Sequence, residues 1–355
     1  MTGDPSARDL AARLERFLTR ELRAGAVRVS QLDRSTEGFS QETFHFESEI
    51  VAGGGRSEGR AWVAKREPEA GLLEPYDLEP EFRVLHALGG EPGILAPPTP
   101  LFCADPAVLE RSFYLMERLP GRVPLPAAGP GGQPPFDDAT RHALAPQVTA
   151  ALAALHAVDW RARGLGFLGD PGARAAAREL ARWKTRIDKT GLPLAPILTD
   201  SLAWLEASLP TSGETTLVHG DFRLGNFLVT GEGRETRLSG VLDWEMVHLG
   251  DPLEDLAWCS SMLWRGGTPY AAALLPPGEL AALYAEQSGR AVDPERLRFY
   301  EVFSVVKMIA IMLTGIRAFL DGRTSDLRMA IFDHQLPFLH ALLAVTRGWL
   351  PGVAP

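Results

Sequence analysis

The sequence predicts an α+β protein with a small, β-rich first part and a larger, mostly helical second part. Segments rich in β-branched and aromatic residues gather in the first third of the chain, and alanine-rich segments with helical spacing follow. A stretch rich in proline and glycine, residues 119–133, lies between the two. We therefore expect two domains, residues 1–118 and residues 119–355.

The overall composition is that of an ordinary globular protein. Of its 355 residues, 45% are hydrophobic and 23% are charged. The net charge of −9 argues against general nucleic-acid binding, which needs a basic surface. No run of about 18 uncharged apolar residues occurs, so no membrane-spanning helix is expected. The two cysteines, Cys103 and Cys259, lie far apart without a zinc motif and favour a reducing, cytoplasmic location.

Several segments of the first part have the patterns of regular structure. Residues 1–22 predict a short amphipathic helix rather than a secretory signal, and apolar residues at helical spacing predict a second helix over 78–88. Residues 53–59 begin with three glycines and predict a hairpin loop. Predicted strands lie at residues 27–32, 43–51, 61–65 and 113–116.

The second part is helical except for one β-rich island, residues 217–244. Its predicted helices lie at residues 139–160, 173–189, 201–209, 278–288, 294–320 and 325–347. Within the island, residues 227–230 and 236–242 predict two strands, and a Gly-Glu-Gly turn joins them. The island is therefore expected to fold as a hairpin.

Three polar side chains gather at the open end of this hairpin. Asn226 stands just before the first strand and Asp243 just after the second, so strand pairing predicts that they are neighbours in space. Asp221 lies in the loop that enters the hairpin. Carboxylate and carboxamide oxygens suit Mg²⁺, and a carboxylate off the metal can accept the proton of an attacking hydroxyl. These are the parts that phosphoryl transfer requires.

The order of the motifs resembles the aminoglycoside phosphotransferase family. The matching motifs are His219-Gly220-Asp221 with Asn226, then Leu242-Asp243-Trp244-Glu245, then Gly250-Asp251-Pro252 with Asp255. The family is a branch of the protein-kinase-like fold. The resemblance therefore implies a bilobal protein with a β-rich N-lobe, a helical C-lobe and a ligand cleft between the lobes. By position, Asp221 would be the catalytic base, and Asn226 and Asp243 would bind Mg²⁺.

The resemblance also implies nucleotide contacts in the first domain. Lys65, at the end of the third predicted strand, would contact the α- and β-phosphates, oriented by Glu81, with Glu79 as a rival partner. Residues 37–43 would form the loop over the nucleotide and contain Ser40, although they hold one glycine instead of several. Residues 114–121 would form the hinge that meets the adenine, through Met116, Glu117 and Leu119.

Other residues of the motifs have structural interpretations. His219 is expected to organise its loop, and Asp255 to brace it. Asp251, Pro252 and Glu254 match the start of a helix, with an aspartate cap, an early proline and a glutamate that completes a capping box.

The expected activity is transfer of a phosphoryl group from ATP or GTP to a hydroxyl of a small molecule. The candidate acceptors are an aminoglycoside, a macrolide, a hydroxyacyl thioester, choline or a sugar, and the C-terminal helices show no acidic cluster that would mark a polycation pocket. An inactive nucleotide-binding scaffold is the alternative from another class. A third is a non-haem iron site built on His219 and Asp221 with His248 or His334. The sequence leaves the oligomeric state open.

Overall fold

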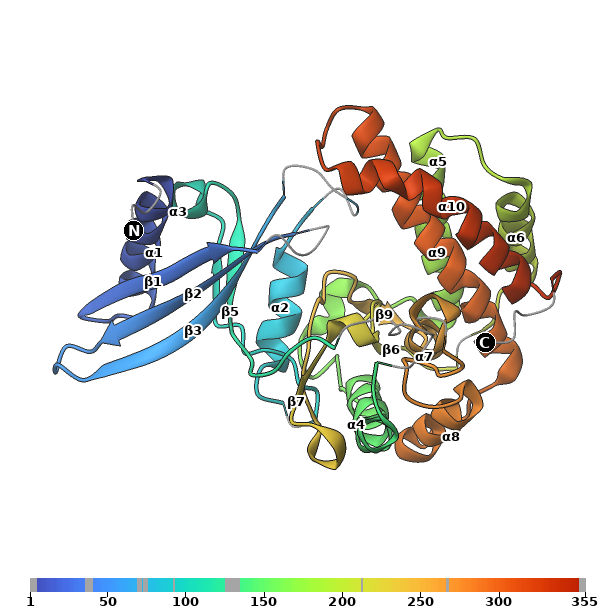
Figure 1. Ribbon diagram of the computed structural model, residues 1–355, viewed down its shortest axis with the longest axis horizontal. Coiled ribbons are helices and arrows are strands. Elements are labelled where there is room, and N and C mark those ends of the chain that lie inside the picture. Colours follow the sequence, from blue (N-terminus) through green and yellow to red (C-terminus); the bar gives the residue numbers. More distant parts are fainter. Residues whose placement is uncertain are drawn as a thin grey trace. The chain divides into compact units, whose positions relative to one another are not determined.

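The computed structural model describes residues 5–35, 41–68, 72, 76–91, 93–124, 135–211, 213–265 and 268–350. The chain divides into two compact units. The first is Met1–Gly90 with Pro97–Leu119, and the second is Glu91–Ala96 with Pro120–Pro355. Figure 1 shows the strand-rich first unit in blue and cyan and the helical second unit in green to red. This division into a sheet unit and a helical unit is the predicted α+β class.

The first unit is built on an antiparallel sheet of five strands in the order β1-β2-β3-β5-β4. Its strands are β1 (Ala26–Arg34), β2 (Glu42–Val51), β3 (Ser57–Arg66), β4 (Leu101–Cys103) and β5 (Phe113–Glu117). β3 begins four residues before its predicted start, because Ser57 to Arg60 pair with the end of β2 despite a glycine at position 59. β4 was not predicted, because three residues are too few to show the alternation of apolar and polar side chains that marks a strand.

Helix α1 (Pro5–Glu21) packs its apolar side against this sheet. Leu14, Phe17 and Leu18 lie in one cluster with Phe46 and Trp62, all of them buried. The Trp62 indole N–H donates to Ser48 Oγ at 2.8 Å, so the polar atom of this buried ring is satisfied. Two further helices of the unit are α2 (Glu79–Leu88) and α3 (Pro106–Leu109).

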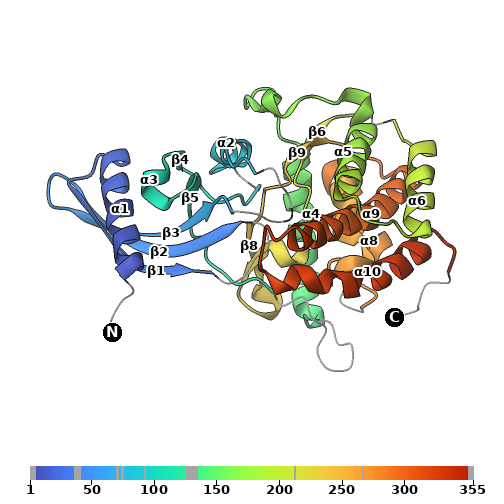
Figure 2. The same cartoon turned by 90° about the horizontal axis from the view of Figure 1, so that it is seen from above.

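The second unit consists mainly of helices, as Figure 2 shows from above. They are α4 (Asp138–His156), α5 (Ala175–Thr190), α6 (Pro196–Ala207), α7 (Leu253–Ser260), α8 (Pro277–Ser288), α9 (Pro294–Leu320) and α10 (Leu327–Thr346). α6 starts five residues before its predicted start, at a proline that suits the first turn of a helix. Helix α9 packs against α5, α6, α7 and α10 and forms the centre of this unit.

Two small sheets interrupt the helices. The predicted hairpin is present as β7 (Phe227–Thr230) and β8 (Arg237–Val241), joined by a connection that includes a 3₁₀ turn at Gly233–Glu235. A second pair, β6 (Thr216–Val218) with β9 (His248–Gly250), was not predicted. Its strands have three residues each and lie far apart in sequence, so no local pattern marks them.

Helix α9 is long and apolar enough, by length and composition alone, to cross a membrane. Its most apolar window has a mean hydropathy of 1.8, yet 61% of that window is buried against the rest of the protein. The helix also carries Lys307, which is 1% exposed. These features are those of a central packing helix.

We predict that Gly231→Ala destabilises the hairpin far more than Gly233→Ala does. Both glycines have positive φ, which costs an alanine roughly 1–2 kcal/mol. A Cβ at position 231 would also lie 2.5 Å from the Glu235 carbonyl oxygen, whereas one at position 233 meets open space. The free energy of unfolding, measured in urea, should therefore fall by roughly 2–4 kcal/mol for the first variant. Equal losses in the two variants would contradict the steric argument.

Candidate active site

The loop of residues 219–226 is anchored where it leaves β6. Strand β6 pairs with β9, with Val218 opposite His248. The backbone N–H groups of His219 and Gly220 then donate to the two oxygens of Asp255, at 2.7 and 2.8 Å. Asp255 is completely buried on helix α7. Because hydrogen bonds to a charged carboxylate are short and strong, Asp255 fixes two successive peptides of the loop.

Gly220 is required at its position by both conformation and space. Its φ is +82°, a region that residues with a Cβ rarely adopt. A Cβ there would also lie 2.5 Å from the Met246 carbonyl oxygen. The loop therefore passes closer to the backbone at residue 246 than any side chain would allow.

His219 ties the loop to the end of strand β8. Its Nδ1 accepts from the Asp221 backbone N–H at 3.2 Å, and its Nε2 lies 3.1 Å from the Leu242 carbonyl oxygen. The carbonyl can only accept, so Nε2 carries the proton. Burial lowers the pKa of His219, against the opposing attraction of Asp255 and Asp221, and this favours the neutral ring. Both ring nitrogens are engaged by the backbone, which removes the geometric basis of the iron-site alternative.

The carboxylate of Asp221 is held by three side chains. Asn226 Nδ2 donates to Oδ2 at 2.7 Å, and Trp258 Nε1 donates to Oδ1 at 2.7 Å. Arg223 Nε lies 2.9 Å from Oδ1 and 3.1 Å from Oδ2. Asp221 is 8% exposed. It is therefore an oriented carboxylate that keeps a small area open to solvent.

Asn226 and Asp243 stand at the same end of the β7–β8 hairpin. Phe227 pairs with Val241, and the Leu242 N–H donates to the Asn226 carbonyl at 2.7 Å. Residue 226 thus lies beside residue 242, the neighbour of Asp243. Asp243 has a φ of +68°, which is uncommon outside glycine. Such backbone strain persists where the surrounding structure enforces it, and functional sites are the usual setting.

The oxygen atoms at this end of the hairpin fit a hard divalent cation. The amide nitrogen of Asn226 donates to the Asp221 carbonyl at 2.9 Å as well as to its carboxylate, which leaves Oδ1 as the ligand atom. Asp243, the second predicted ligand, would add a carboxylate oxygen. A few carboxylate and amide oxygens, completed by phosphate and water, form the usual coordination of Mg²⁺. The donor set therefore fits the predicted metal.

In the first unit, Lys65 and Glu81 are brought to the same face of the sheet. Lys65 lies opposite Tyr114 in the pairing of β3 with β5, so these two side chains share a face. The Tyr114 hydroxyl donates to one oxygen of Glu81 at 2.8 Å, and Gln41 Nε2 donates to the other at 2.7 Å. Glu81 is buried on α2, whereas its rival Glu79 is the first residue of that helix and is exposed.

The predicted adenine contacts lie at the end of β5, and Ser40 lies outside the described residues. Met116 pairs with Val63 and Glu117 with Trp62. The backbone N–H of Glu117 donates to Pro98 at 2.8 Å. That of Leu119, by contrast, makes no hydrogen bond within the part of the chain that the structure describes. Of the three predicted adenine contacts Met116, Glu117 and Leu119, Leu119 is thus the one whose backbone N–H has no described acceptor.

The structure corrects the interpretation of Glu254 as part of a capping box. Asp251 Oδ1 does accept from the N–H of Leu253, the first residue of α7, at 3.0 Å. The Glu254 carboxylate turns inward instead, 3.2 Å from His248 Nε2 and 3.1 Å from Lys307 Nζ. His248 precedes it by six residues on β9, and Lys307 lies far away in sequence on α9, so the local capping pattern could not reveal these partners.

Two residues that touch the loop were missed by the sequence analysis. Trp258 binds the Asp221 carboxylate, and Lys307 Nζ donates to the Gly220 carbonyl at 2.7 Å. One pattern could have indicated Trp258: it follows Asp255 by three residues on α7, which places both on one helix face. Nothing local marks Lys307, whose contacts are all tertiary.

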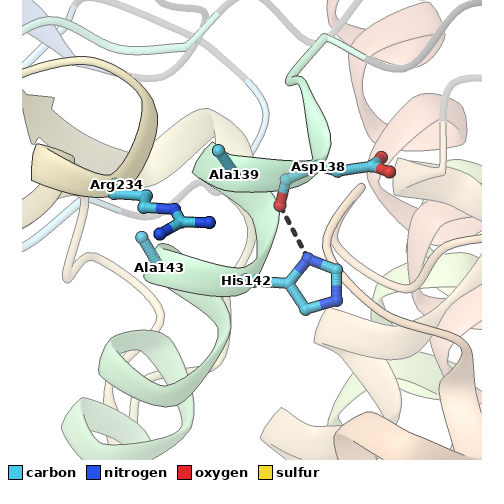
Figure 3. Close-up of a pocket in the computed structure, with 5 residues that line it drawn as sticks. All are labelled: Asp138, Ala139, His142, Ala143 and Arg234. Carbon is cyan, nitrogen blue, oxygen red and sulfur yellow. Dashed lines mark hydrogen bonds between the residues drawn. The ribbon is translucent and has the colours of Figure 1, made fainter.

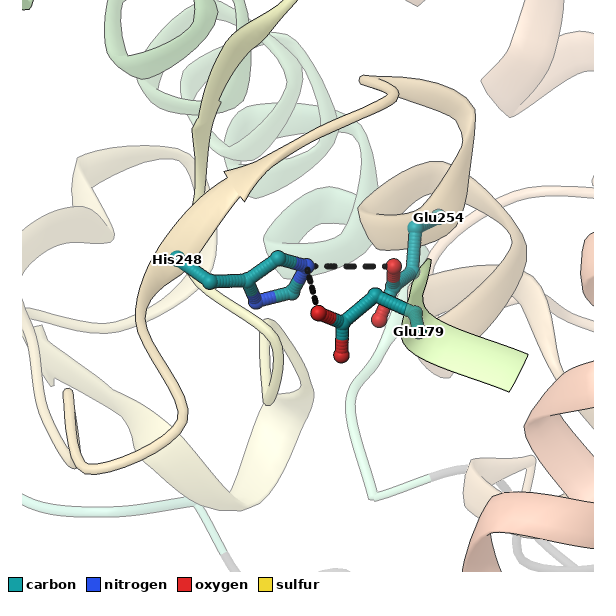
Figure 4. A group of neighbouring side chains, drawn as sticks. All are labelled: Glu179, His248 and Glu254. Atoms are coloured by element: carbon teal, nitrogen blue, oxygen red, sulfur yellow. Dashed lines mark hydrogen bonds and ion pairs between the residues drawn. The ribbon is translucent and has the colours of Figure 1, made fainter. Parts of the chain in front are cut away.

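Glu179, His248 and Glu254 form a buried group whose ligand atoms lie within 4.8 Å of one another (Figure 4). Burial alone would lower the pKa of His248, but Glu179 and Glu254 raise it above its ordinary value. Burial would likewise raise the pKa of Glu254, but Lys307 and His248 lower it to about 2. Arg182 lies 3.3 Å from Glu179. The charges are already paired within the protein, so we assign this group as an ion network and not as a metal site.

Two surface cavities of the second unit are lined by none of the predicted site residues. One lies over α4 and is lined by Asp138, Ala139, His142, Ala143 and Arg234, with His142 Nδ1 2.7 Å from the Asp138 carbonyl oxygen (Figure 3). Another lies where α6 ends and α9 begins, and Trp204 and Arg298 contribute to it.

A β-rich unit, a helical unit and an aspartate loop beside a hairpin define a protein-kinase-like phosphotransferase fold. Residues 34–300 match the model of the phosphotransferase enzyme family that includes the aminoglycoside kinases, and the chain belongs to this family. Among solved structures, a Ralstonia eutropha protein provisionally assigned as an aminoglycoside phosphotransferase is 26% identical, with a TM-score of 0.70 over 95% of this chain and 98% of that one. The macrolide 2′-phosphotransferase MphH of Brachybacterium faecium is 22% identical, with a TM-score of 0.55 over 93% and 97%. These likenesses confirm the predicted fold.

Relatives in animals carry a different kind of name. Acyl-CoA dehydrogenase family member 11 of Gallus gallus is 30% identical over 337 residues, which cover 88% of this chain and 40% of that protein. Acyl-CoA dehydrogenase family member 10 of Mus musculus is 30% identical over 246 residues, which cover 69% and 21%. The chain thus spans well under half the length of these relatives.

We predict that stability falls at both ends of the pH range through the ion network. The pKa of Glu254 in the folded protein, about 2, lies below its ordinary value of 4.5. Its contribution to the free energy of unfolding is therefore complete above pH 4.5 and is lost as the pH falls toward 2. The pKa of His248 in the folded protein lies above its ordinary value of 6.5. Its contribution to the free energy of unfolding is therefore complete below pH 6.5 and is lost as the pH rises through the pKa of the folded state. Urea unfolding across pH should show both declines.

The alkaline decline should disappear in His248→Gln, which cannot titrate, while the acid decline persists. His334→Gln, at an exposed position of α10, is the matched control and should follow the wild type. An unchanged alkaline decline in His248→Gln would show that another group causes it.

Proposed function

We propose that this protein transfers the γ-phosphoryl group of ATP or GTP to a hydroxyl of a small molecule. The observation that carries the proposal is the oriented carboxylate of Asp221, hydrogen-bonded to Asn226 at the end of the hairpin that also presents Asp243. Family membership supports the reaction class. Structural relatives hold nucleotides: one is a GDP complex and another contains AMP-PNP with hygromycin B.

In the proposed reaction Asp221 accepts the proton of the acceptor hydroxyl. The acceptor oxygen forms a bond to the γ-phosphorus as the bond from that phosphorus to the bridging oxygen breaks, and the nucleoside diphosphate leaves. Trp258, Arg223 and Asn226 hold the carboxylate in one orientation, so little reorganisation is needed when the hydroxyl arrives. Mg²⁺, when bound, would neutralise charge on the β- and γ-phosphates, and Asn226 Oδ1 with the Asp243 carboxylate would hold it.

The first unit would bind the rest of the nucleotide. Lys65 would contact the α- and β-phosphates, with Glu81 as the acidic residue that reaches its face of the sheet. The unengaged backbone N–H of Leu119 would donate to the adenine, beside Met116 and Glu117. We also propose a cytoplasmic location, since both cysteines are free and buried.

For the acceptor, we propose a hydroxyacyl thioester. The relatives that are 30% identical are named as acyl-CoA dehydrogenases, whereas the solved structures named as antibiotic kinases are 18 to 26% identical. A phosphotransferase segment within proteins named for acyl-CoA chemistry favours an acyl-CoA acceptor. The charge of the second part of the chain is consistent with this proposal. From Pro120 onward the chain has 22 Lys and Arg against 25 Asp and Glu, which is nearly neutral. A polycationic aminoglycoside would favour a more acidic binding region.

The acceptor prediction is tested by a screen for phosphorylated products. The protein is incubated with Mg·ATP or Mg·GTP and a panel of hydroxyacyl-CoA esters, aminoglycosides, macrolides, choline and sugars, and the products are read by mass spectrometry. We expect a mass increase of one phosphoryl group on a hydroxyacyl-CoA ester and none on an acyl-CoA ester that lacks the hydroxyl. Product on an aminoglycoside alone would overturn the thioester proposal, and binding of nucleotide without any product would favour the inactive scaffold.

Asp221→Asn should reduce turnover by about two to four orders of magnitude, the usual worth of a general base. Asparagine keeps the size of the side chain and one acceptor oxygen, so nucleotide affinity should change little. Asp326→Asn, at the half-buried N-cap of α10, serves as the control and should retain wild-type turnover. Near-normal turnover of Asp221→Asn would refute the assignment of the base.

A further inference from the structure

Lys307 is a buried cation aimed at the 219–226 loop. It lies midway along α9 and is 1% exposed. Its ammonium group donates to the Gly220 carbonyl at 2.7 Å and to Glu254 Oε1 at 3.1 Å. The desolvation cost of a buried ion pair consumes most of its attraction, so such a pair contributes little net stability. What the pair does supply here is a fixed donor for one particular carbonyl.

That carbonyl belongs to the peptide that enters Asp221. The N–H of Gly220 is already bound by Asp255 at 2.8 Å, so Lys307 fixes the opposite side of the same residue. Gly220 has no side chain to pack, and its φ of +82° lies in the region open mainly to glycine. External hydrogen bonds must therefore set the orientation of this peptide, and with it the direction of the Asp221 side chain.

The same ammonium group lies against the ring of Trp258. The distance from Nζ to the ring centroid is 4.6 Å, within the range of a cation–π interaction. Trp258 is buried, and its indole N–H donates to Asp221 Oδ1 at 2.7 Å. Lys307 is therefore connected to Asp221 in two ways, through its hydrogen bond to the Gly220 carbonyl and through its contact with the Trp258 ring.

The position of Lys307 is in turn fixed by the ion network of Figure 4. Glu254 pairs with His248 Nε2 at 3.2 Å, and His248 Nδ1 lies 2.9 Å from the Met246 carbonyl oxygen. Glu179 Oε1 lies 4.0 Å from His248 Nε2. The ammonium group is thus held by Glu254 of α7, whose other oxygen pairs with His248 of β9.

We infer that Lys307 and Trp258 are positioning residues for Asp221, acting together on its backbone and its carboxylate. The inference rests on the proposed function, in which Asp221 accepts the proton of the acceptor. Trp258 contacts the Asp221 carboxylate and Lys307 contacts the Gly220 carbonyl, so both residues would act through Asp221. Losing either should lower turnover, because the carboxylate samples other orientations, while leaving the binding of nucleotide unchanged.

A matched pair of tryptophan variants tests this. Trp258→Phe keeps a ring beside Lys307 and removes only the N–H that holds Asp221. Trp183→Phe is the control, because Trp183 also faces Lys307, at 5.6 Å, and no described residue accepts from its indole N–H. We expect kcat to fall roughly tenfold to a hundredfold in Trp258→Phe, the worth of one hydrogen bond to a charged group, with KM for the nucleotide unchanged. Trp183→Phe should retain wild-type kcat to within about twofold.

Lysine variants test the second route. Lys307→Met keeps the length of the side chain without its charge and should lower kcat with little change in KM, and Lys307→Arg, which keeps a donor and the charge, should recover part of the loss. In the Asp221→Asn background, Trp258→Phe and Lys307→Met should produce no further loss, because the group that they position is gone. Equal kcat in the two tryptophan variants, or a loss confined to KM, would overturn the inference.

An NMR measurement tests the contact between Trp258 and Asp221 without measuring turnover. In protein labelled with ¹⁵N on its eight tryptophans, the Trp258 indole N–H resonance is identified by its absence from Trp258→Phe. It should shift in Asp221→Asn and in Lys307→Met or Lys307→Arg and stay in place in Trp183→Phe. A resonance indifferent to Asp221 and Lys307 would refute the positioning contact. If the contact is present and no acceptor is phosphorylated, the proposed function fails and the arrangement around Asp221 stands.

Discussion

The buried carboxylate of Asp255 is the constraint on which the candidate site depends. It accepts the backbone N–H groups of His219 and Gly220 and lies 3.2 Å from His156 Nε2, whose other nitrogen meets the Tyr284 hydroxyl at 2.7 Å. Burial alone would raise the pKa of Asp255, but the hydrogen bond and charge of His156 outweigh it and lower the pKa. Through Asp255, His156 and Tyr284, helices α4, α7 and α8 are thus connected to the two residues that precede Asp221.

Around this anchor, the site is held by interactions that leave its backbone few alternatives. Gly220 and Asp243 both have positive φ, one made possible by the missing side chain and the other imposed at the strand end. His219 connects the two through its neutral ring, from the Asp221 N–H to the Leu242 carbonyl. The result is a rigid set of oxygen and nitrogen atoms in which little reorganisation is needed for proton transfer.

The sequence predicted those features of the fold and the site that depend on residues close together in the chain. The β7 strand and its turn are local, so the meeting of residue 226 with the end of β8 followed from hairpin geometry. Strands β6 and β9 have three residues each and pair across a long separation, and they were missed. Glu254 fitted a local capping pattern, yet tertiary partners on β9 and α9 decided its orientation. Lys307 sits in an apolar helix whose period gives no sign of an inward charge.

We propose that Asn226 Oδ1 and the Asp243 carboxylate bind the metal of a nucleoside triphosphate whose γ-phosphate faces Asp221. A crystal structure of the protein soaked with Mn²⁺ and AMP-PNP tests it most directly, because Mn²⁺ scatters anomalously and can be located without bias. We expect an anomalous peak between residues 226 and 243, beside the β- and γ-phosphates, with Asp221 free of the metal. A peak at Glu179, His248 and Glu254, or a nucleotide bound away from the hairpin end, would contradict it.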